Sequence, residues 1–312
     1  MKLAAESTLG RVRGAAGDRG RLRARGRRRR LRVTIAFVDS GYGCIDPLNR
    51  NDRGQNRILA GYDAINNVVN TWAQDDGSGH GTHVMTAAVS SYGTDAAGSQ
   101  VVAGLDRGGV TYHGVAPGAD LVSVRAFDAN GQASYASVIR GISWVVANAK
   151  TYNIRVMNLS FAAPPRSYYW EDPLNQAVMK AWKAGIVVVA SAGNGGPNPM
   201  TIGVPGNVPY VVTVGAMTDR NTPSVGTDDV LASFSAAGPT YEGFVKPEVV
   251  APGGHLMAMM NVNTTIAVGH PEFYNGNYGS YFKMSGTSQA AAVVSGMAAL
   301  VLSANPPSPR TR

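Results

Sequence analysis

Apolar and polar positions along the chain fall into blocks that predict parallel strands covered by helices. Short runs rich in β-branched residues indicate buried strands, because both faces of a parallel sheet are covered. The stretches between them carry apolar residues at helical spacing. The predicted strands cover 33–38, 119–126, 154–160, 186–191 and 210–215, and the predicted helices cover 80–91, 134–150, 173–184 and 288–303. This order predicts an α/β fold, a three-layer, doubly wound and mostly parallel sheet with helices on both faces.

A single domain accounts for most of the chain. The 312 residues, 44% of them hydrophobic, suffice for one large core. No internal repeat or interdomain linker is visible, so one domain is predicted for 33–304, with surface loops at 221–229 and 268–280. The proline-rich segment 305–312 is predicted to be a disordered tail. No apolar run approaches the roughly 18 residues of a membrane span, so a soluble protein without a membrane segment is expected.

The formal net charge of +8 is concentrated at the start of the chain. Eleven arginines and Lys2, against Glu6 and Asp18, give residues 1–32 a net charge of +10, and the rest of the chain sums to −2. A segment of this composition has too little apolar surface to fold, so we predict a disordered arm. Such an arm is expected to bind polyanions weakly through counterion release, whereas the domain carries no basic binding face.

The compartment cannot be derived from the cysteine content or from the N-terminal residues. Cys44 is the single cysteine, so no internal disulfide forms. A secretory signal needs an apolar stretch after the basic residues, and the one available, VTIAFV at 33–38, has the pattern of a core strand. No signal peptide is therefore visible.

Two polar residues stand where strands end or helices begin, positions that suit catalysis. Asp39 follows the strand 33–38, and strand carboxyl ends form the edge where open α/β sheets place their sites. His80 lies between glycines in GSGHGTHV, at the start of a predicted helix. Taken alone, Asp39 is more often a turn or helix-capping residue. His80 and His83 have two alternatives, a zinc pair and two polar residues of a glycine loop.

Two further residues supply the other parts that acyl transfer needs. Ser288, in SGTSQAAAVVSG, opens a helix, so free backbone N–H groups and the positive end of the helix dipole face a reacting carbonyl. A plain helix N-cap has the same pattern. Asn194, in SAGNGG, directly follows a strand, and its amide can donate to an oxyanion. An asparagine that supplies a left-handed turn is the common alternative.

Together these segments resemble the signature blocks of the subtilisin-like serine proteases, and the bacterial alkaline subtilases in particular. The blocks are VDSGYG at 38–43, GHGTHV at 79–84, SAGNGG at 191–196 and SGTSQA at 285–290, in the family's order of Asp, His, Asn and Ser. The stretches between them are similar too, so the resemblance covers about residues 33–304. It implies a subtilisin-like peptidase domain, a serine endopeptidase that cuts polypeptides through an acyl-enzyme intermediate.

The resemblance also implies a role for each candidate residue. Asp39 orients His80, and His80 acts as general base and acid for the nucleophile, Ser288. Asn194 and the Ser288 backbone N–H form the oxyanion hole. The peptide substrate is expected to add as a strand between two edges. These edges are Gly131, Gln132 and Ala133 on one side and Ser160, Phe161 and Ala162 on the other, and the primary specificity pocket is lined by Phe161, Ala162, Ala192, Gly193 and Gly203.

Some positions depart from the family pattern. Gln289 stands where the family has Met and Ala292 where it has Pro; little damage is expected, because Ala is a good helix former. Ala162 replaces the usual Gly of the pocket wall, and its methyl is expected to narrow the pocket. The sequence ends soon after the Ser288 helix, where the family continues, and the Arg-rich tail replaces the usual first segment. Both features bear on stability more than on chemistry.

The chemistry requires no cofactor. The resemblance implies structural calcium, and the oxygen-rich segments 46–55 and 75–78 offer ligands, but neither has a spacing that assigns a site. The family implies an extracellular location and a monomer, with a cytoplasmic location left open. One competing hypothesis is a catalytically dead, truncated remnant of the fold that only binds peptides. Another is a polyanion-binding protein that acts through its tail. A sedolisin-type carboxyl protease is disfavoured, since it would have Glu at the position of His80.

Overall fold

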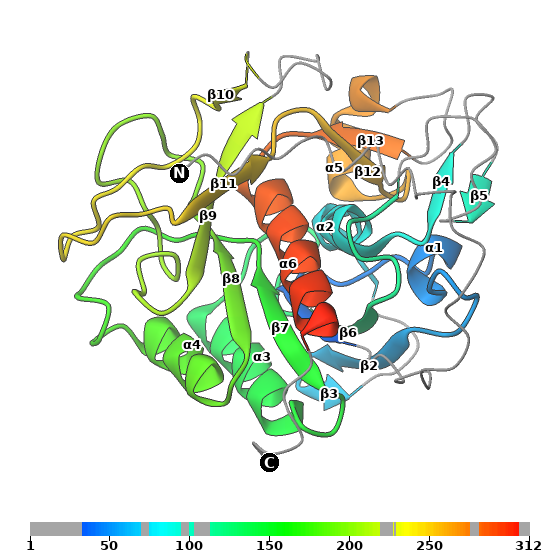
Figure 1. Ribbon diagram of the computed structural model, residues 1–312, viewed down its shortest axis with the longest axis horizontal. Helices are drawn as coiled ribbons and strands as arrows, with labels where there is room; N and C mark the ends of the chain where they lie inside the picture. The colour runs from blue at the N-terminus through cyan, green and yellow to red at the C-terminus, as the bar shows by residue number, and fades with distance from the viewer. Residues whose placement is uncertain are drawn as a thin grey trace, which may run out of the picture.

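A nine-stranded sheet forms the centre of the protein. The computed structural model describes residues 33–69, 75–94, 100–102, 113–218, 227, 229–274 and 281–305. The predicted tails, apart from Asn305, lie outside this range, as do parts of the loops predicted at 221–229 and 268–280. The strand order is β10-β9-β8-β7-β1-β6-β2-β3, with β11 beside β9 (Figure 1). The sheet strands are β1 (Thr34–Asp39), β2 (Ile58–Asp63), β3 (Val68–Val69), β6 (Asp120–Arg125), β7 (Ile154–Leu159), β8 (Val187–Ser191), β9 (Val212–Thr218), β10 (Val230–Leu231) and β11 (Val249–Pro252).

The centre of this sheet is parallel and covered by helices on both faces. Strand β1 lies between β6 and β7 and pairs with both in parallel, and β8 and β9 continue in the same sense. Helices α3 (Tyr135–Asn148) and α4 (Pro173–Lys183) pack on one face, and α2 (His80–Val89) and α6 (Thr287–Ala304) on the other. All six residues of β1 are buried. The α/β fold class is therefore confirmed, and so are all five predicted strands and all four predicted helices.

Short elements surround the sheet, and the hydrophobic pattern did not predict them. They are α1 (Asp46–Asn49), α5 (Thr265–Gly269), the 3₁₀ helix η1 (Pro271–Phe273), and two antiparallel pairs, β4 (Tyr92–Thr94) with β5 (Gln100–Val102) and β12 (Leu256–Met259) with β13 (Tyr281–Met284). None is long enough to establish a helical or alternating period. Their importance lies in position, because α5 and the β12–β13 pair lie beside α2, which begins at His80 (Figure 1).

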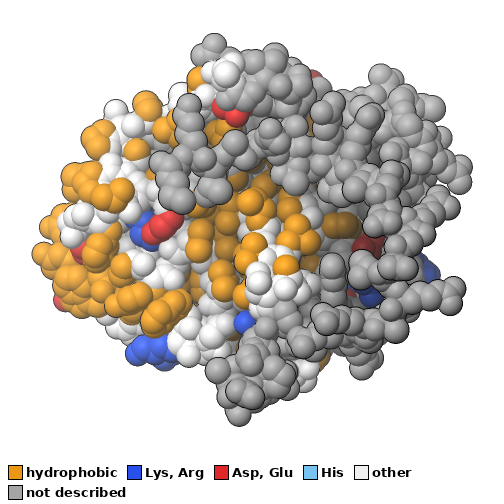
Figure 2. Space-filling view, viewed as in Figure 1, with side chains coloured by type: hydrophobic (Ala, Val, Ile, Leu, Met, Phe, Trp, Pro, Cys, Tyr) orange, Lys and Arg blue, Asp and Glu red, His pale blue; other side chains and the backbone are white. Residues whose placement is uncertain are grey.

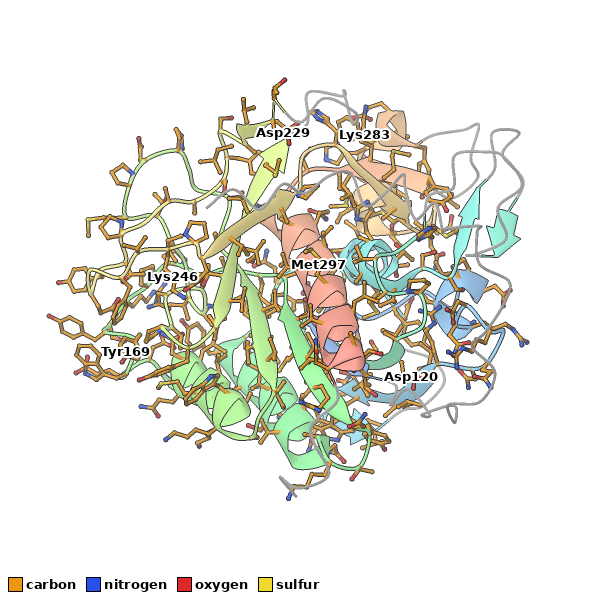
Figure 3. All side chains as sticks on the ribbon, viewed as in Figure 1. Asp120, Tyr169, Asp229, Lys246, Lys283 and Met297 are labelled. Atoms are coloured by element: carbon orange, nitrogen blue, oxygen red, sulfur yellow. The ribbon has the colours of Figure 1, made fainter. Side chains whose placement is uncertain are left out.

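Helix α6 buries its first half and exposes apolar residues in its second. The stretch from Thr287 to Ala292 is buried throughout, whereas Met297, Leu300 and Val301 are exposed, and apolar side chains show on this face in Figures 2 and 3. Within the described part of the chain, α6 is the one helix with the length and hydropathy of a membrane span. The sequence predicted no membrane segment because no uninterrupted apolar run is long enough, and small polar residues interrupt the apolar residues of α6. Half of α6 is buried in the protein, as expected for a core helix.

His83 fixes the contact of α2 with β13 and α6. The side chain is fully buried. Its Nε2 lies 3.0 Å from the carbonyl oxygen of Phe282, and its Nδ1 lies 3.4 Å from the amide nitrogen of Gln289. The ring thus donates from Nε2 and accepts at Nδ1, which makes it a neutral imidazole. Neither nitrogen is left for a metal, so the zinc pair with His80 is excluded.

We expect this histidine to weaken the fold in acid. Burial lowers the pKa of His83 to about 4. Below about pH 6.5, His83 is protonated in the unfolded chain, whereas in the folded protein it stays neutral down to about pH 4. The free energy of unfolding should therefore fall by about 3 kcal/mol across this window because of His83 alone. Urea unfolding of the wild type and of His83→Gln at several pH values measures the difference, because the variant lacks this contribution.

His270→Gln is the matched control for that measurement. The His270 side chain is 59% exposed, so this substitution removes a histidine without disturbing the buried contacts of α2. The same pH dependence in the wild type and in His83→Gln would contradict the assignment.

Candidate active site

Asp39 ends the central strand β1 and places a buried carboxylate at the carboxyl edge of the sheet. Parallel strands on both sides of β1 hold it in register, with Asp39 opposite Arg125 in β6. The carboxylate is 4% exposed, and its Oδ1 accepts a hydrogen bond of 2.8 Å from the Ser40 N–H. The turn or capping alternative for Asp39 is not supported, because the residue is the last of a strand and its Oδ1 also reaches His80.

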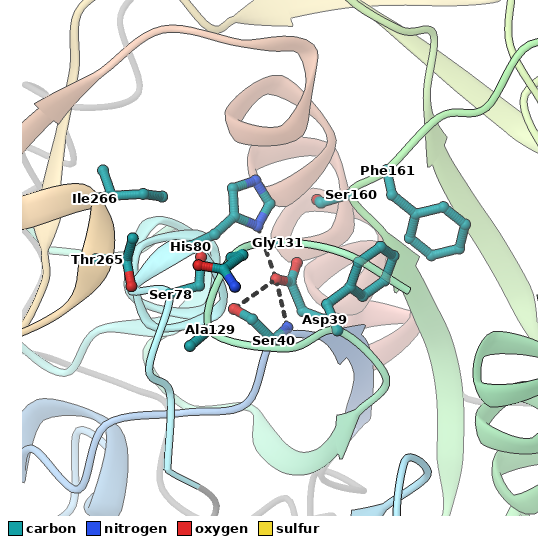
Figure 4. Close-up of a pocket in the computed structure, with 12 residues that line it drawn as sticks. Asp39, Ser40, Ser78, His80, Ala129, Gly131, Ser160, Phe161, Thr265 and Ile266 are labelled. Atoms are coloured by element: carbon teal, nitrogen blue, oxygen red, sulfur yellow. Dashed lines mark hydrogen bonds and ion pairs between the residues drawn. The ribbon is translucent and has the colours of Figure 1, made fainter. Parts of the chain in front are cut away.

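His80 is the first residue of α2. The chain enters this helix through Gly79, whose φ of 91° lies in the left-handed region that favours glycine. The Nδ1 atom of His80 lies 2.7 Å from Oδ1 of Asp39 (Figure 4). With Nδ1–H donating to the carboxylate, Nε2 keeps its lone pair and can accept a proton. The ring is 23% exposed and borders a pocket, so a substrate can reach it.

The pKa of His80 lies above its ordinary value. Burial acts to lower it, but the charge of Asp39, the hydrogen bond to Asp39 and the charge of Asp76 together outweigh that effect. The imidazolium formed by proton uptake is therefore stabilised where it forms. This is the electrostatic arrangement that a general base beside a buried carboxylate requires.

Asp76 ties the end of β1 to the start of α2. Its Oδ1 accepts hydrogen bonds from the Ser40 hydroxyl (2.8 Å) and the Gly79 N–H (2.8 Å). Its Oδ2 accepts from the N–H (2.7 Å) and the hydroxyl (2.5 Å) of Thr82. Burial raises the pKa of Asp76, and these hydrogen bonds oppose the rise. The residues that flank Asp39 and His80 are thus held by one buried carboxylate.

Ser288 is the second residue of α6 and lies beside the end of β7. It is nearly buried, at 8% exposure. Its hydroxyl donates to the carbonyl oxygen of Ser160 at 2.9 Å, and Ser160 borders the same pocket as His80. The sequence predicted that Ser288 lies at a helix N-terminus, and the structure confirms this prediction. In this structure its hydroxyl proton is bonded to Ser160 and not to His80.

Asn194 lies in the turn after β8 and contacts the start of α6. Its Oδ1 accepts from the N–H and from the hydroxyl of Thr287, both at 2.9 Å. Since a backbone N–H can bond only to the oxygen of the amide, this contact fixes the amide orientation and leaves Nδ2 for a ligand. The positive φ in this turn, 107°, belongs to Gly193. The alternative in which Asn194 supplies the left-handed turn is therefore wrong.

The residues predicted for the primary pocket converge in space. A Cβ atom added at Gly203 would lie 2.8 Å from the Cβ of Ala162, and one added at Gly193 would lie 3.3 Å from it. The methyl of Ala162 thus stands between two glycines, with Ala192 buried behind them. The predicted substrate edges meet elsewhere in the cleft, where Gly131, Ser160 and Phe161 line one pocket. Gln132 and Ala133 are exposed beside Gly131.

Within the described ranges, the two oxygen-rich segments show no carboxylate cluster that assigns a calcium site. The Asp76 carboxylate of the segment 75–78 is occupied by four protein donors. In the segment 46–55, Asp46 pairs with Arg50, and the Asn51 side-chain oxygen accepts two backbone N–H groups. Over the described ranges, no three His, Cys, Asp or Glu side chains are grouped closely enough to hold a metal ion.

Sequence reasoning missed four contributors to this site. Asp76 was treated only as part of an oxygen-rich segment, and its sequence position four residues before α2 is no helix-capping position, so no local signal marks it. Phe127 lies two residues beyond β6, close to the strand end as Asp39 is at the end of β1, so the same reasoning about strand ends would have found it. Thr265 and Ile266 carry no local signal, because only the tertiary fold brings α5 to His80.

Comparison with known proteins places the chain among proteases. The model of the Subtilase family matches residues 32–311. The serine protease AprX of Bacillus subtilis is 36% identical over 88% of this chain and 58% of its own length, and subtilisin E of the same species is 34% identical over 88% and 56%. The chain thus spans about half the length of these curated relatives.

Solved structures agree on the fold. Sphericase superposes with a TM-score of 0.67 at 23% identity, over 89% of this chain and 79% of that chain. A cold adapted subtilisin-like serine proteinase gives a TM-score of 0.59 at 26% identity, over 88% and 76%. With a family match over nearly the whole sequence and this fold, the chain belongs to the subtilase family.

Proposed function

We propose that this chain is a serine endopeptidase that hydrolyses polypeptides by a triad of Asp39, His80 and Ser288. The observation that carries the proposal is the 2.7 Å contact between His80 Nδ1 and Asp39 Oδ1 at the sheet edge. Ser288 lies at the N-terminus of a neighbouring helix. Together the three residues provide the nucleophile, the base and the orienting group that acyl transfer needs. Membership of the subtilase family supports the same activity and the same class of substrate.

The base acts through the nitrogen that Asp39 leaves free. His80 Nε2 takes the hydroxyl proton of Ser288 and later returns it to the leaving amine. Asp39 holds the tautomer and stabilises the imidazolium. Because the pKa of His80 is raised, the base form predominates only above the ordinary pKa of an imidazole.

The nucleophile must turn before it reacts. The Ser288 hydroxyl is bonded to the Ser160 carbonyl, an acceptor on the edge where the substrate strand adds. A substrate N–H that pairs with this carbonyl competes with the hydroxyl. Substrate binding therefore favours rotation of Ser288 toward His80, so that the nucleophile is activated when a peptide is present.

The oxyanion is received by two donors. The Ser288 N–H lies in the first turn of α6, where backbone N–H groups lack helical partners. Asn194 Nδ2 is the second donor, and Thr287 fixes its direction by holding the other end of the amide. Such donors act mostly on the transition state, because they are aimed where charge develops.

The other predictions from the sequence remain untested. These are polyanion binding by residues 1–32, the extracellular location, the monomeric state and a structural calcium whose site is unassigned. The inert peptide-binding remnant is the second candidate function. The assembled contact between Asp39 and His80 favours the active enzyme, since a remnant has no reason to retain it.

A fluorophosphonate probe should label the purified protein at Ser288 and should fail to label Ser288→Ala. Turnover of a peptide should fall by roughly 10⁴ to 10⁶ in Ser288→Ala, His80→Ala and Asp39→Ala, values measured in subtilisin, a relative of this chain. The double variant Ser288→Ala/His80→Ala should lose no more than a single one, because the residues act as a unit. Steady-state kinetics and mass spectrometry of the labelled peptide provide the measurements. Labelling elsewhere, or folded protein without labelling, supports the inert remnant.

Asn194→Leu should lower turnover by roughly 10² to 10³ with little change in KM, a size known from a subtilisin oxyanion donor. The substitution removes the Nδ2 donor at similar volume. Asn194→Gly separates catalysis from backbone geometry, because glycine tolerates every backbone conformation but donates nothing. Full turnover in Asn194→Gly would remove this residue from the mechanism.

Ala162→Gly should widen the primary pocket. The methyl between Gly193 and Gly203 is expected to restrict the enzyme to small side chains, so its removal should raise kcat/KM for a peptide with Phe before the scissile bond by about 10-fold relative to Ala. Ala163→Gly is the control: its backbone pairs with Val204, and along an extended chain its side chain faces away from that of Ala162. A Phe-to-Ala ratio that stays at the wild-type value in Ala162→Gly would contradict this pocket assignment.

A further inference from the structure

Helix α5 borders the cleft on the side of His80 that the four sequence blocks leave open. A pocket of 220 Å³ lies beside the imidazole, and both Thr265 and Ile266 line it from α5. Phe127 and Phe161 line the same pocket from the ends of β6 and β7. In Figure 4, Ile266 and Phe161 lie on opposite sides of the His80 ring.

Backbone contacts hold α5 at this position. The Thr265 N–H donates to the Gly77 carbonyl at 2.9 Å, and the Ile266 N–H donates to the Ser78 carbonyl at 3.2 Å. Both acceptors belong to the loop that leads into His80, so α5 and the catalytic histidine share one anchor. Behind Ile266, a small core of Met260, Ala267 and Phe282 packs the segment in place. Ile266 is therefore a fixed wall of the pocket.

Two walls of this pocket are apolar, and polar residues such as Ser78 and Asn130 complete its lining. The ring of Phe127 packs against that of Phe161 with centroids 5.1 Å apart, which fixes one wall. Ile266 forms the other and is itself only partly buried. Ala129 also lines the pocket between them. A branched apolar side chain that enters here would bury apolar surface on two sides.

The alternating direction of side chains along an extended peptide decides which substrate side chain enters this pocket. This step rests on the proposed function. Successive side chains of a strand point to opposite faces. If the residue whose carbonyl is attacked directs its side chain between Ala162 and Gly203, the preceding residue directs its side chain to the other face, where His80 and the 220 Å³ pocket lie.

We propose that Ile266 determines specificity: with Phe127 it selects a branched apolar side chain at the substrate residue immediately before the one whose carbonyl is attacked. Ile266 also lines a second pocket of 330 Å³, together with His270, Phe273 and Met284. Its side chain is the partition between the two cavities. This partition limits the length of the side chain that the first pocket accepts.

A peptide series that differs only at that residue tests the proposal, with Ala, Val, Leu and Phe as the four members. The wild type should prefer Leu and Val to Ala by about 10-fold in kcat/KM, the size expected for a few methylene groups in a hydrophobic pocket. Ile266→Ala should reduce the Leu-to-Ala ratio to about 2-fold and raise the Phe-to-Leu ratio, because the partition is lost. Ile266→Phe should reverse the preference in favour of Ala, because the larger ring fills the pocket.

Val268→Ala is the matched control on the same helix. Val268 is 68% exposed and lines neither pocket, so its removal should preserve every ratio of the series. Thermal unfolding of each variant verifies that the proteins are folded. Both Ile266 variants should lower the Leu-to-Ala ratio, one by opening the pocket and the other by filling it, so either folded variant suffices for the test.

The results separate this inference from the proposed function. Labelling of Ser288 by the fluorophosphonate and hydrolysis of the Ala peptide report on the function alone. Hydrolysis with the same Leu-to-Ala ratio in the wild type and the folded Ile266 variants overturns the role of Ile266. An equal change in Val268→Ala overturns it as well. Absence of both labelling and hydrolysis refutes the proposed function.

Discussion

A single buried carboxylate, that of Asp76, connects the two distant segments that carry Asp39 and His80. It accepts from Ser40 at the end of β1 and from Gly79 and Thr82 around the start of α2. Removing a carboxylate from water is costly, and its four hydrogen bonds are what make its burial tolerable. Because Asp39 is next to Ser40 and His80 is next to Gly79, the contact between Asp39 and His80 depends on this cluster. The negative charge of Asp76 also helps to hold the pKa of His80 above its ordinary value.

The parallel sheet supplies the second constraint. The carboxyl ends of β1, β6, β7 and β8 lie at one edge, so the residues that follow these strands meet there although they are far apart in sequence. Asp39, Phe127, Ser160 and Ala192 each follow or end one of these strands. The first turn of α6 approaches the same edge and places Ser288 against Ser160. Local sequence thus decides the residue types, and strand register decides which of them meet.

The sequence predicted the parts of the fold in which a hydrophobic pattern extends over many residues or a distinctive motif is present. The strands that build the sheet core are continuous apolar runs, and α2, α3, α4 and α6 each extend over several turns, so the pattern averages over many residues. The positions of Asp39, His80, Asn194 and Ser288 followed from glycine-rich motifs next to those elements. Helix α5 has five residues and no period of its own. Its placement depends on backbone bonds to Gly77 and Ser78, which leave no trace in the pattern of side chains.

Two contacts show why a sequence motif cannot predict the orientation of the side chains in a site. The oxyanion role proposed for Asn194 depends on which end of the amide points outward, and the bond from the Thr287 N–H decides that. The resting position of Ser288 depends on the carbonyl oxygen of Ser160, which lies one residue beyond the end of β7. A peptide that adds as a strand, as proposed, needs backbone acceptors of this kind. The hydroxyl of Ser288 satisfies one of them, so the same hydrogen bond that holds the nucleophile away from His80 also keeps the empty edge from carrying an unsatisfied buried carbonyl.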